Sequence, residues 1–414
     1  MSSSRCQVLI LLGTYTPGYK AGGPIRSIEN LVAALGEEFN FRIVTLDRDL
    51  GDKSPFPNVA ANRWVRVGHA DVMYLRPGLR GSVDVYALLR SVDRETVLFL
   101  TSFFARSFSM LAVLMCRLNL CRPRCLVLAP HGEFSTGALQ IKRTRKRLYI
   151  VISRWLGLYR GLIWRASSRF EAADICRQFP RAKDIEGGGV IPGSEASGRK
   201  TWTGYVATAT DFASVAAPVP RERRPKMRGQ LRLVFVSRLA RMKNLSGALS
   251  VLKGISGDVS FDIYGPAEDA EYWEECQGLI AALPANIRVR YWGEIEHDKT
   301  EQVFAEHDLF LFPTLGEAFG HVIPEAFLAG CPVLTSDQTP WRGLETLGVG
   351  WDLPLAQPER YREVLQQCVD MRPEEHGAMS ARAAAFGAER ARDPAVIEQN
   401  RALFRLAFAM PLPE

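Results

Sequence analysis

Two glutamates stand near each other in the stretch PTLGEAFGHVIPEAFLAGCPVLTSD, which runs from Pro313 to Asp337. Glu317 lies in an acidic loop bounded by glycines, and Glu325 lies in the helical pattern that follows. A carboxylate in that helix can accept two hydrogen bonds from a vicinal diol such as a ribose, whereas one in the loop can meet the hydroxyls of a sugar. The pair therefore predicts one carboxylate for each end of a nucleotide sugar. An acidic first helical turn stabilised by its own dipole would show the same pattern.

The backbone between the two glutamates could also bind a ligand. Gly316 and Gly320 allow the chain to approach a ligand closely. The amides that follow lead into the helix N-terminus, where oriented N–H groups favour anions and hydroxyl oxygens. The amides expected at the donor belong to Ala318, Phe319 and Gly320.

Cations and glycines follow two other expected strands. Arg238 and Lys243, in SRLARMKN, come just past the strand expected at Leu231–Val236. Positive charges at that position can neutralise a diphosphate leaving group, although a solvated basic turn would have the same composition. In the first half, AGGPIRS places Gly22 and Gly23 directly before an expected helix, and this pair alone also fits a plain turn.

Alternating strand and helix patterns position these residues. The runs VLILL, FRIVTL, ETVLFLTS and CLVLAPHG read as buried strands, and such apolar runs fit a parallel sheet covered on both faces. A long helical stretch is expected between HG and ASSRFEAADI, and GVIPGS closes this half. From LRLVFVS to PVLTSD the alternation restarts, which predicts a second parallel sheet with right-handed crossovers.

The domain boundaries follow from this alternation. We expect an N-terminal acceptor-binding domain at 1–193, a linker with an irregular insertion at 194–230, and a nucleotide-sugar-binding domain at 231–395. Residues 396–414 are expected to form a C-terminal helix that packs back on the first domain. The fold class is thus α/β, with two Rossmann-like domains. Because ligands bind at the carboxyl ends of such sheets, the expected site is the cleft between the domains.

Composition narrows the class of protein. A chain of 414 residues is too long for one ordinary core, and 47% hydrophobic with 23% charged residues is ordinary for a globular protein. The eight cysteines show no CxxC pairs or metal-ligand spacing, which favours free thiols in a reducing cytoplasm. VLILL reads as a first strand and not as a signal peptide, and no apolar run is long enough to span a membrane.

The motifs together resemble the family 4 retaining glycosyltransferases, which have the GT-B fold. GEAFGHVIPEA and SRLARMKN carry the resemblance in the second half, and GGPIRSIENLVAAL, PHGEF and SSRFEAADI carry it in the first. The resemblance spans nearly the whole chain. Within the family, the chain is similar above all to members that build bacterial capsular polysaccharides and exopolysaccharides.

The resemblance implies a role for each matched position. Glu317 would contact the donor sugar and Glu325 the nucleotide ribose. Arg238 and Lys243 would hold the diphosphate, and the Gly22–Gly23 turn would close over it. His131, in PHGEF, matches the histidine beside the transferred sugar. Taken alone, His131 would equally fit a loop histidine with an ordinary hydrogen-bonding role.

The expected chemistry needs neither a covalent nucleophile nor a metal. No carboxylate in the first half has the context of a nucleophile, so a retaining reaction would proceed on one face, with the departing diphosphate helping to deprotonate the acceptor. The two cations and the helix N-terminus would stabilise the leaving charge in place of a metal. A rival motif, Asp47-Arg48-Asp49, matches the DxD pattern of metal-dependent GT-A transferases, but the second Rossmann-like half argues against that fold.

A basic stretch in the first half suggests a membrane partner. IKRTRKRLYIVISRWLGLYRGLIWRASSRF clusters five cations before three aromatic residues. A basic amphipathic helix of this kind suits the inner face of an anionic membrane, and a core helix with a solvated charged face is the alternative. No nucleic-acid fold signature accompanies the net charge of +7. The residues concerned are Lys142, Arg143, Arg145, Lys146, Arg147, Trp155, Tyr159 and Trp164.

The sequence therefore predicts a cytoplasmic, peripheral membrane glycosyltransferase that needs no cofactor. It would move a hexose from a nucleoside diphosphate sugar to a growing, lipid-linked glycan of the cell surface. A nucleotide-sugar epimerase of the same fold and a catalytically silent partner protein that binds nucleotide sugars are the alternatives.

Overall fold

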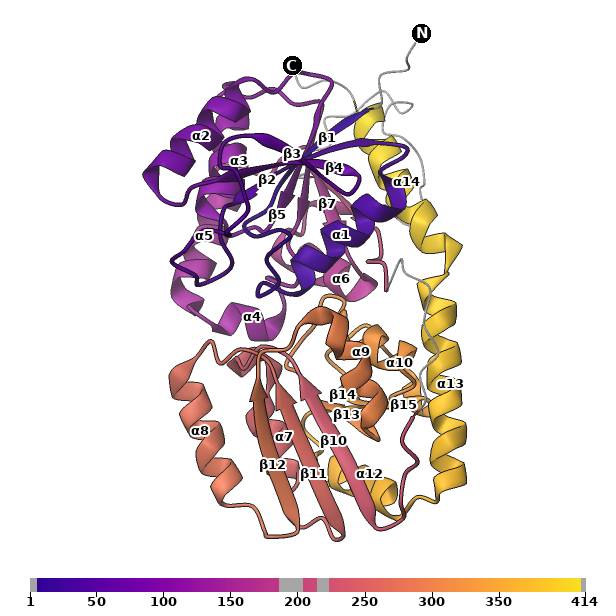
Figure 1. Cartoon of the computed structure of the whole chain (residues 1–414). Helices are drawn as coiled ribbons and strands as arrows, with labels where there is room; N and C mark the ends of the chain where they lie inside the picture. Colours follow the sequence, from indigo (N-terminus) through magenta and orange to yellow (C-terminus); the bar gives the residue numbers. More distant parts are fainter. Residues whose placement is uncertain (1–5, 186–203, 214–222, 411–414) are drawn as a thin grey trace. The chain divides into compact units, whose positions relative to one another are not determined.

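The computed structural model describes residues 6–185, 204–213 and 223–410 (Figure 1). Contacts divide the chain into two compact units. Unit 1 comprises Met1–Phe212 together with Pro394–Glu414, and unit 2 comprises Ala213–Asp393. Each unit has its own sheet and its own buried core, so each is described separately.

Unit 1 is built on a nine-stranded sheet of order β3-β4-β2-β1-β5-β6-β7-β9-β8. Adjacent strands are parallel except β3, which pairs antiparallel with β4 at the edge. Successive residues of β1 point to opposite faces, so Val8 and Ile10 join one core while Leu9 and Leu11 join the other. The strands are β1 (Gln7–Leu11), β2 (Asn40–Leu46), β3 (Trp64–Val67), β4 (Ala70–Leu75), β5 (Val97–Thr101), β6 (Cys125–Ala129), β7 (Ile163–Ala166), β8 (Ala182–Ile185) and β9 (Gly204–Thr208).

Helices cover both faces of this sheet. In Figure 1, α1 and α14 lie on one side, and α2, α3 and α5 lie on the other. Apolar residues at helical spacing bury each inner face, as Ile25, Ile28, Leu31, Val32 and Leu35 do for α1. The helices are α1 (Gly23–Leu35), α2 (Leu79–Arg90), the π turn η1 (Arg106–Met110), α3 (Leu111–Arg117), α4 (Thr136–Gln140), α5 (Arg143–Trp155), α6 (Arg169–Gln178) and α14 (Pro394–Ala409).

The C-terminal helix α14 completes the core of unit 1. The ring of Phe404 lies 5.1 Å from that of Phe39, 5.7 Å from that of Phe41 and 6.1 Å from that of Phe99. Asn400 donates from its side chain to the carbonyl of Thr210 at 2.8 Å. Residues from both ends of the chain therefore share one hydrophobic interior.

Unit 2 is built on a six-stranded sheet of order β12-β11-β10-β13-β14-β15, with every pair parallel. Its strands are β10 (Gln230–Val236), β11 (Asp258–Tyr264), β12 (Ile287–Gly293), β13 (Leu309–Phe312), β14 (Val333–Ser336) and β15 (Gly350–Leu353). Its helices are η3 (Arg241–Lys243), α7 (Leu245–Val251), α8 (Ala270–Ala281), α9 (His297–Glu306), α10 (Val322–Leu328), α11 (Leu344–Leu347), α12 (Pro358–Asp370) and α13 (Pro373–Ala391).

The structure differs from the sequence prediction in several places. The long helical stretch after HG is interrupted by β7, because Ile163–Ala166 form a fully buried strand between β6 and β9. Residues 204–208, placed in the irregular insertion, form β9 and pair with β7 and β8. The edge strand β3 was not predicted, since its half-exposed residues lack an apolar run. The segment GVIPGS, expected to close this half of the chain, lies outside the described residues.

Candidate active site

Lys243 and Glu317 meet in unit 2 at the carboxyl edge of its sheet. Lys243 Nζ lies 2.7 Å from a carboxylate oxygen of Glu317, and the two side chains are 16% and 11% exposed. Lys243 follows β10 and Glu317 follows β13, and these strands are neighbours in the sheet. The sequence placed both residues at a ligand site, and the structure shows that they are direct partners.

Hydrogen bonds tie the two loops together and explain this pairing. The backbone N–H of Leu315 donates to the carbonyl of Met242 at 2.9 Å, and the Thr314 hydroxyl donates to the same carbonyl at 3.1 Å. Asn244 caps α7 in the left-handed conformation, and its side-chain amide donates to the carbonyl of Pro313 at 2.7 Å. The Thr314 hydroxyl also lies 3.0 Å from Glu317 Oε1. The loops therefore hold the lysine and the glutamate in one place.

The loop after Glu317 is compact, and a hydrogen bond from a buried tryptophan holds its backbone. Gly320 has a φ of 78°, and a Cβ at this position would lie 3.2 Å from the Glu317 side chain, so a larger residue would crowd the carboxylate. The carbonyl of Phe319 accepts a hydrogen bond of 2.6 Å from the indole N–H of the buried Trp341. Ala318 and Gly320 flank it and lead into α10, which carries Glu325 in its first turn.

Arg238 also follows β10, but it turns toward the other neighbouring strand. Its guanidinium lies 3.1 Å from Glu268, which comes after β11, and the arginine side chain is 35% exposed. The two cations expected at one diphosphate therefore have separate carboxylate partners in this structure. Their shared role stays a prediction.

In unit 1, the glycine pair stands at the start of α1. Gly22 is the N-cap with a φ of 66°, and Gly23 is the first helical residue. Asp49 holds the preceding loop, because its carboxylate accepts hydrogen bonds from the backbone N–H groups of Tyr19, at 2.8 Å, and Lys20, at 3.2 Å. The loop before the helix is thus held by Asp49, which the sequence suggested as part of a metal-binding DxD pattern.

His131 lies at the carboxyl end of β6 in a left-handed conformation. Its φ is 50°, and the following Gly132 has a φ of 81°. Such a conformation is unfavourable for a histidine and requires support from its surroundings. Two carboxylates, Glu133 and Glu171, supply that support.

Glu171 and Glu133 bind the backbone on both sides of the histidine. Glu171 is fully buried and accepts from the N–H of Gly132 at 2.6 Å and from the N–H of Ser167 at 2.8 Å. Glu133 accepts from the Ser102 hydroxyl at 2.7 Å and from the N–H of Phe103. Burial raises the pKa of both carboxyls above the ordinary glutamate value, although these hydrogen bonds act in the opposite direction. The sequence analysis missed both roles.

The DxD residues each have a local partner. Asp47 accepts a hydrogen bond from the side chain of Arg48 at 2.8 Å. Asp49 accepts hydrogen bonds from the backbone N–H groups of Tyr19 and Lys20. Among the described residues, no group of three or more histidine, cysteine or acidic side chains is placed to hold a metal ion.

The basic cluster lies at the start of α5, and the structure shows which side chains of the stretch face outward. Lys146 turns inward, where its ammonium donates to the carbonyl of Ala138 at 2.7 Å. Trp164 and Tyr159 are buried in the core, so of the three aromatic residues only Trp155, which is 82% exposed, faces outward. The other four cations of the cluster, Lys142, Arg143, Arg145 and Arg147, are exposed.

Solved structures of similar shape define the class of fold. The structure of Anabaena HepE in complex with UDP and glucose aligns with a TM-score of 0.64 and 15% identity, over 97% of this chain and 99% of that chain. Sucrose-phosphate synthase from Thermosynechococcus elongatus aligns with a TM-score of 0.67 and 16% identity, over 98% and 100%. The chain has the GT-B fold, as predicted from its sequence.

The family comparison concerns unit 2. Residues 220–385 match the family described as glycosyl transferases group 1. A 2-deoxystreptamine N-acetyl-D-glucosaminyltransferase from Niallia circulans is 28% identical over 127 residues, which are 30% of this chain. The match covers 32% of that relative's length. The Lys243–Glu317 pair lies inside residues 220–385, the stretch that matches the family.

Proposed function

We propose that the protein is a retaining glycosyltransferase that moves a hexose from a nucleoside diphosphate sugar to a glycan acceptor. The observation that carries this proposal is the Lys243–Glu317 pair of 2.7 Å on two loops at the carboxyl edge of the unit 2 sheet. A cation beside a carboxylate offers one group for a diphosphate and one for sugar hydroxyls. The pair lies within the stretch that matches glycosyl transferases group 1.

The proposed reaction proceeds on one face of the sugar. The bond between the anomeric carbon and the diphosphate oxygen breaks, and its electron pair leaves with the diphosphate. The acceptor hydroxyl attacks from the same face and passes its proton to the leaving diphosphate. Lys243 and Arg238 stabilise the leaving charge, and no metal is required. Glu325 holds the ribose, Glu317 the sugar hydroxyls, and His131 of unit 1 acts beside the transferred sugar.

Donor turnover by the purified protein tests the proposal. UDP-glucose and UDP-N-acetylglucosamine are the first donors to try. Anabaena HepE has been solved in complex with UDP-glucose, and the relative from Niallia circulans is an N-acetyl-D-glucosaminyltransferase. We expect release of UDP that rises with acceptor and persists in EDTA. Epimerised donor without transfer would indicate an epimerase, and binding without any turnover would indicate a silent partner protein. A full requirement for added metal would contradict the proposed role of the cations.

We further propose that the acceptor is lipid-linked, in cell-surface polysaccharide synthesis, and that α5 brings the protein to the inner face of the membrane. No described helix is long and apolar enough to cross a bilayer. On α5, the apolar residues Leu148, Val151, Ile152 and Trp155 are 60%, 59%, 42% and 82% exposed and recur at helical spacing. Four exposed cations adjoin them, a combination that suits an anionic interface.

Vesicle sedimentation tests the membrane proposal. Each cation near an anionic surface contributes about 1 kcal/mol, reduced by salt. Exchange of Lys142, Arg143, Arg145 and Arg147 for Gln should release the protein from anionic vesicles and leave donor binding unchanged. Trp155→Gln should weaken binding to the same vesicles by a smaller factor. If the wild-type protein ignores anionic vesicles at low salt, α5 is an ordinary solvated helix.

A further inference from the structure

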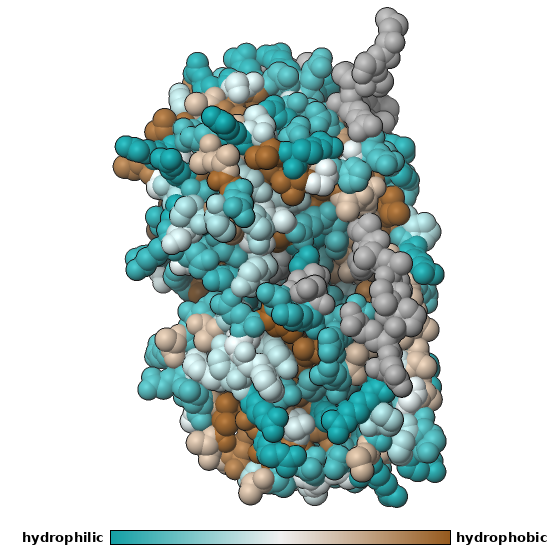
Figure 2. Space-filling view, viewed as in Figure 1, coloured by the Kyte–Doolittle hydropathy of each residue, from teal (hydrophilic) through white to brown (hydrophobic). Residues whose placement is uncertain are grey.

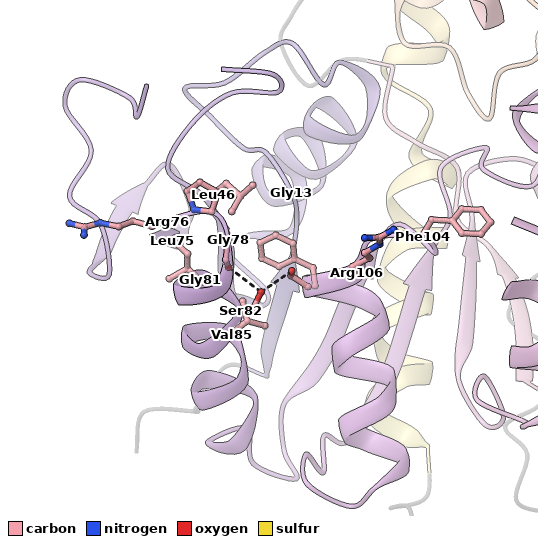
Figure 3. A pocket seen from close by; sticks show the side chains of 13 residues that line it. Gly13, Leu46, Leu75, Arg76, Gly78, Gly81, Ser82, Val85, Phe104 and Arg106 are labelled. Carbon is pink, nitrogen blue, oxygen red and sulfur yellow. Dashed lines mark hydrogen bonds between the residues drawn. The ribbon is translucent and has the colours of Figure 1, made fainter. Parts of the chain in front are cut away.

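A pocket of about 460 Å³ opens in unit 1 at the carboxyl edge of its sheet, between α2 and the π turn (Figure 3). Its floor comes from the ends of β2 and β4, at Leu46 and Leu75, and from the loop after β1. Ligands of parallel α/β sheets bind at this edge, and π turns are frequent at functional sites. Neither the sequence motifs nor the proposed donor site uses this pocket.

Two hydroxyls form the polar centre of the pocket. Ser82, on α2, and Ser107, on the π turn, have hydroxyl oxygens 3.0 Å apart, and Ser82 also donates to the carbonyl of Gly78 at 3.2 Å. Figure 3 draws both hydrogen bonds. A hydroxyl proton can rotate to a new acceptor, so the pair can exchange its mutual hydrogen bond for one to a polar ligand group. Val85 and Phe108 line the pocket around them with apolar surface.

The charged residues of the pocket have one sign. Arg76 and Arg106 are its ionisable lining residues, and no carboxylate lines it. Both arginines are exposed. In Figure 3 the side chain of Arg76 extends away from the serine pair, and Arg106 lies on the other side of that pair. The opening therefore favours an anionic group.

An exposed apolar stripe runs along α2 beside the pocket. Leu79, Val83 and Tyr86 are 87%, 64% and 40% exposed. Gly78, Ser82 and Val85, which line the pocket, each directly precede one of them in the chain. Successive helical residues lie about 100° apart around the axis, so the stripe adjoins the lining face. Figure 2 shows hydrophobic patches among hydrophilic surface over this helix, at the upper left of the view.

We propose that this pocket binds the anionic headgroup of an amphiphilic acceptor, whose apolar chain lies along the Leu79–Val83–Tyr86 stripe. The headgroup is a phosphate or diphosphate that joins the glycan to a lipid. Arg106 contacts the anion, and the Ser107 hydroxyl turns its proton from Ser82 to one of the anion's oxygens. This inference rests on the proposed glycosyl transfer, because it assigns a substrate class to the acceptor of that reaction.

Binding of farnesyl diphosphate to the whole protein, measured by calorimetry, tests the pocket. Inorganic pyrophosphate and farnesol are the separate probes for the anion and for the chain. We expect farnesyl diphosphate to bind more tightly than either. Arg106→Gln should weaken its binding about tenfold, the loss expected for one charge-assisted hydrogen bond. The double variant L79Q/V83Q should weaken binding of farnesyl diphosphate by a similar factor and leave pyrophosphate binding unchanged.

A matched control is available at the C-terminal end of α3, where Leu114 and the C-cap residue Leu118 are 47% and 59% exposed but do not line the pocket. The variant L114Q/L118Q should bind farnesyl diphosphate as the wild-type protein does. The proposal is overturned if farnesyl diphosphate binds no better than pyrophosphate, or if the α2 and α3 variants behave alike. UDP-glucose binding measured in parallel separates this failure from failure of the proposed function, because none of the proposed donor residues lines this pocket.

Discussion

The two units hold their candidate functional residues in different ways. In unit 2, Lys243 and Glu317 hold each other, and both are functional candidates. In unit 1, His131 is held indirectly, by Glu133 and Glu171, which bind backbone N–H groups around it. In the proposed reaction the unit 2 pair exchanges partners when the donor binds, whereas the unit 1 carboxylates hold their loop before any ligand is present. Changes in unit 2 should therefore affect chemistry, and changes in the unit 1 carboxylates should affect stability as well.

The largest effect is expected at Lys243. Lys243→Ala removes the cation that we propose stabilises the leaving diphosphate, so turnover should fall by about two orders of magnitude, while the protein stays folded. Arg241→Ala is the matched control, since Arg241 belongs to the same short helix but pairs with Glu275 at the surface. Steady-state kinetics of both variants provide the measurement. Equal rates for the two variants would remove Lys243 from the mechanism.

The next effect concerns the buried support of His131. Glu171→Ala leaves the N–H groups of Gly132 and Ser167 without their acceptor, which should lower the free energy of unfolding by about 1–3 kcal/mol. Turnover should fall with KM for the donor little changed. Glu171→Gln keeps one accepting oxygen and should recover part of both losses. Urea unfolding and kinetics on the same samples provide the test, and full activity in a destabilised Ala variant would separate the loop from catalysis.

A smaller effect separates the two glutamates of unit 2. Glu325→Ala should weaken binding of free UDP about tenfold, because ribose contacts exist without the sugar. Glu317→Ala should leave UDP binding nearly unchanged and impair transfer. Calorimetry with UDP and then with UDP-glucose distinguishes the two residues. Identical losses for UDP in both variants would refute the division of labour.

The smallest effect is a pH dependence of stability in unit 1. Burial raises the pKa of Glu133 and Glu171, so between the unfolded and folded pKa values the folded state binds protons that the unfolded chain has released. Their contribution to stability is fully present at pH values below the glutamate pKa of the unfolded chain, about 4.3. It is lost as the pH rises through the pKa of the folded state. The difference in unfolding free energy between wild type and Glu171→Gln should change across that window. If this difference in unfolding free energy does not change with pH, burial does not raise the pKa of Glu171.

The sequence predicted the fold better than the contacts within the site. Buried parallel strands read as apolar runs, so the alternation of both units was recognisable. The half-exposed β3 has no such run, and β7 was hidden inside a longer apolar stretch. Pairing of Lys243 with Glu317 depends on how two loops pack, which spacing along the chain does not reveal. The same holds for Glu171 and Gly132, which are 39 positions apart.

The return of α14 to unit 1 has a consequence for the order of synthesis. Unit 2 lies wholly between the two segments of unit 1, so the ribosome makes all of it before Pro394 appears. At about 5–20 residues per second, this interval lasts on the order of ten seconds or more. Until then Phe39, Phe41 and Phe99 lack the ring of Phe404 that packs against them. The nascent first segment therefore presents an uncovered aromatic surface while the second unit is free to fold, and chaperones have that interval in which to bind it.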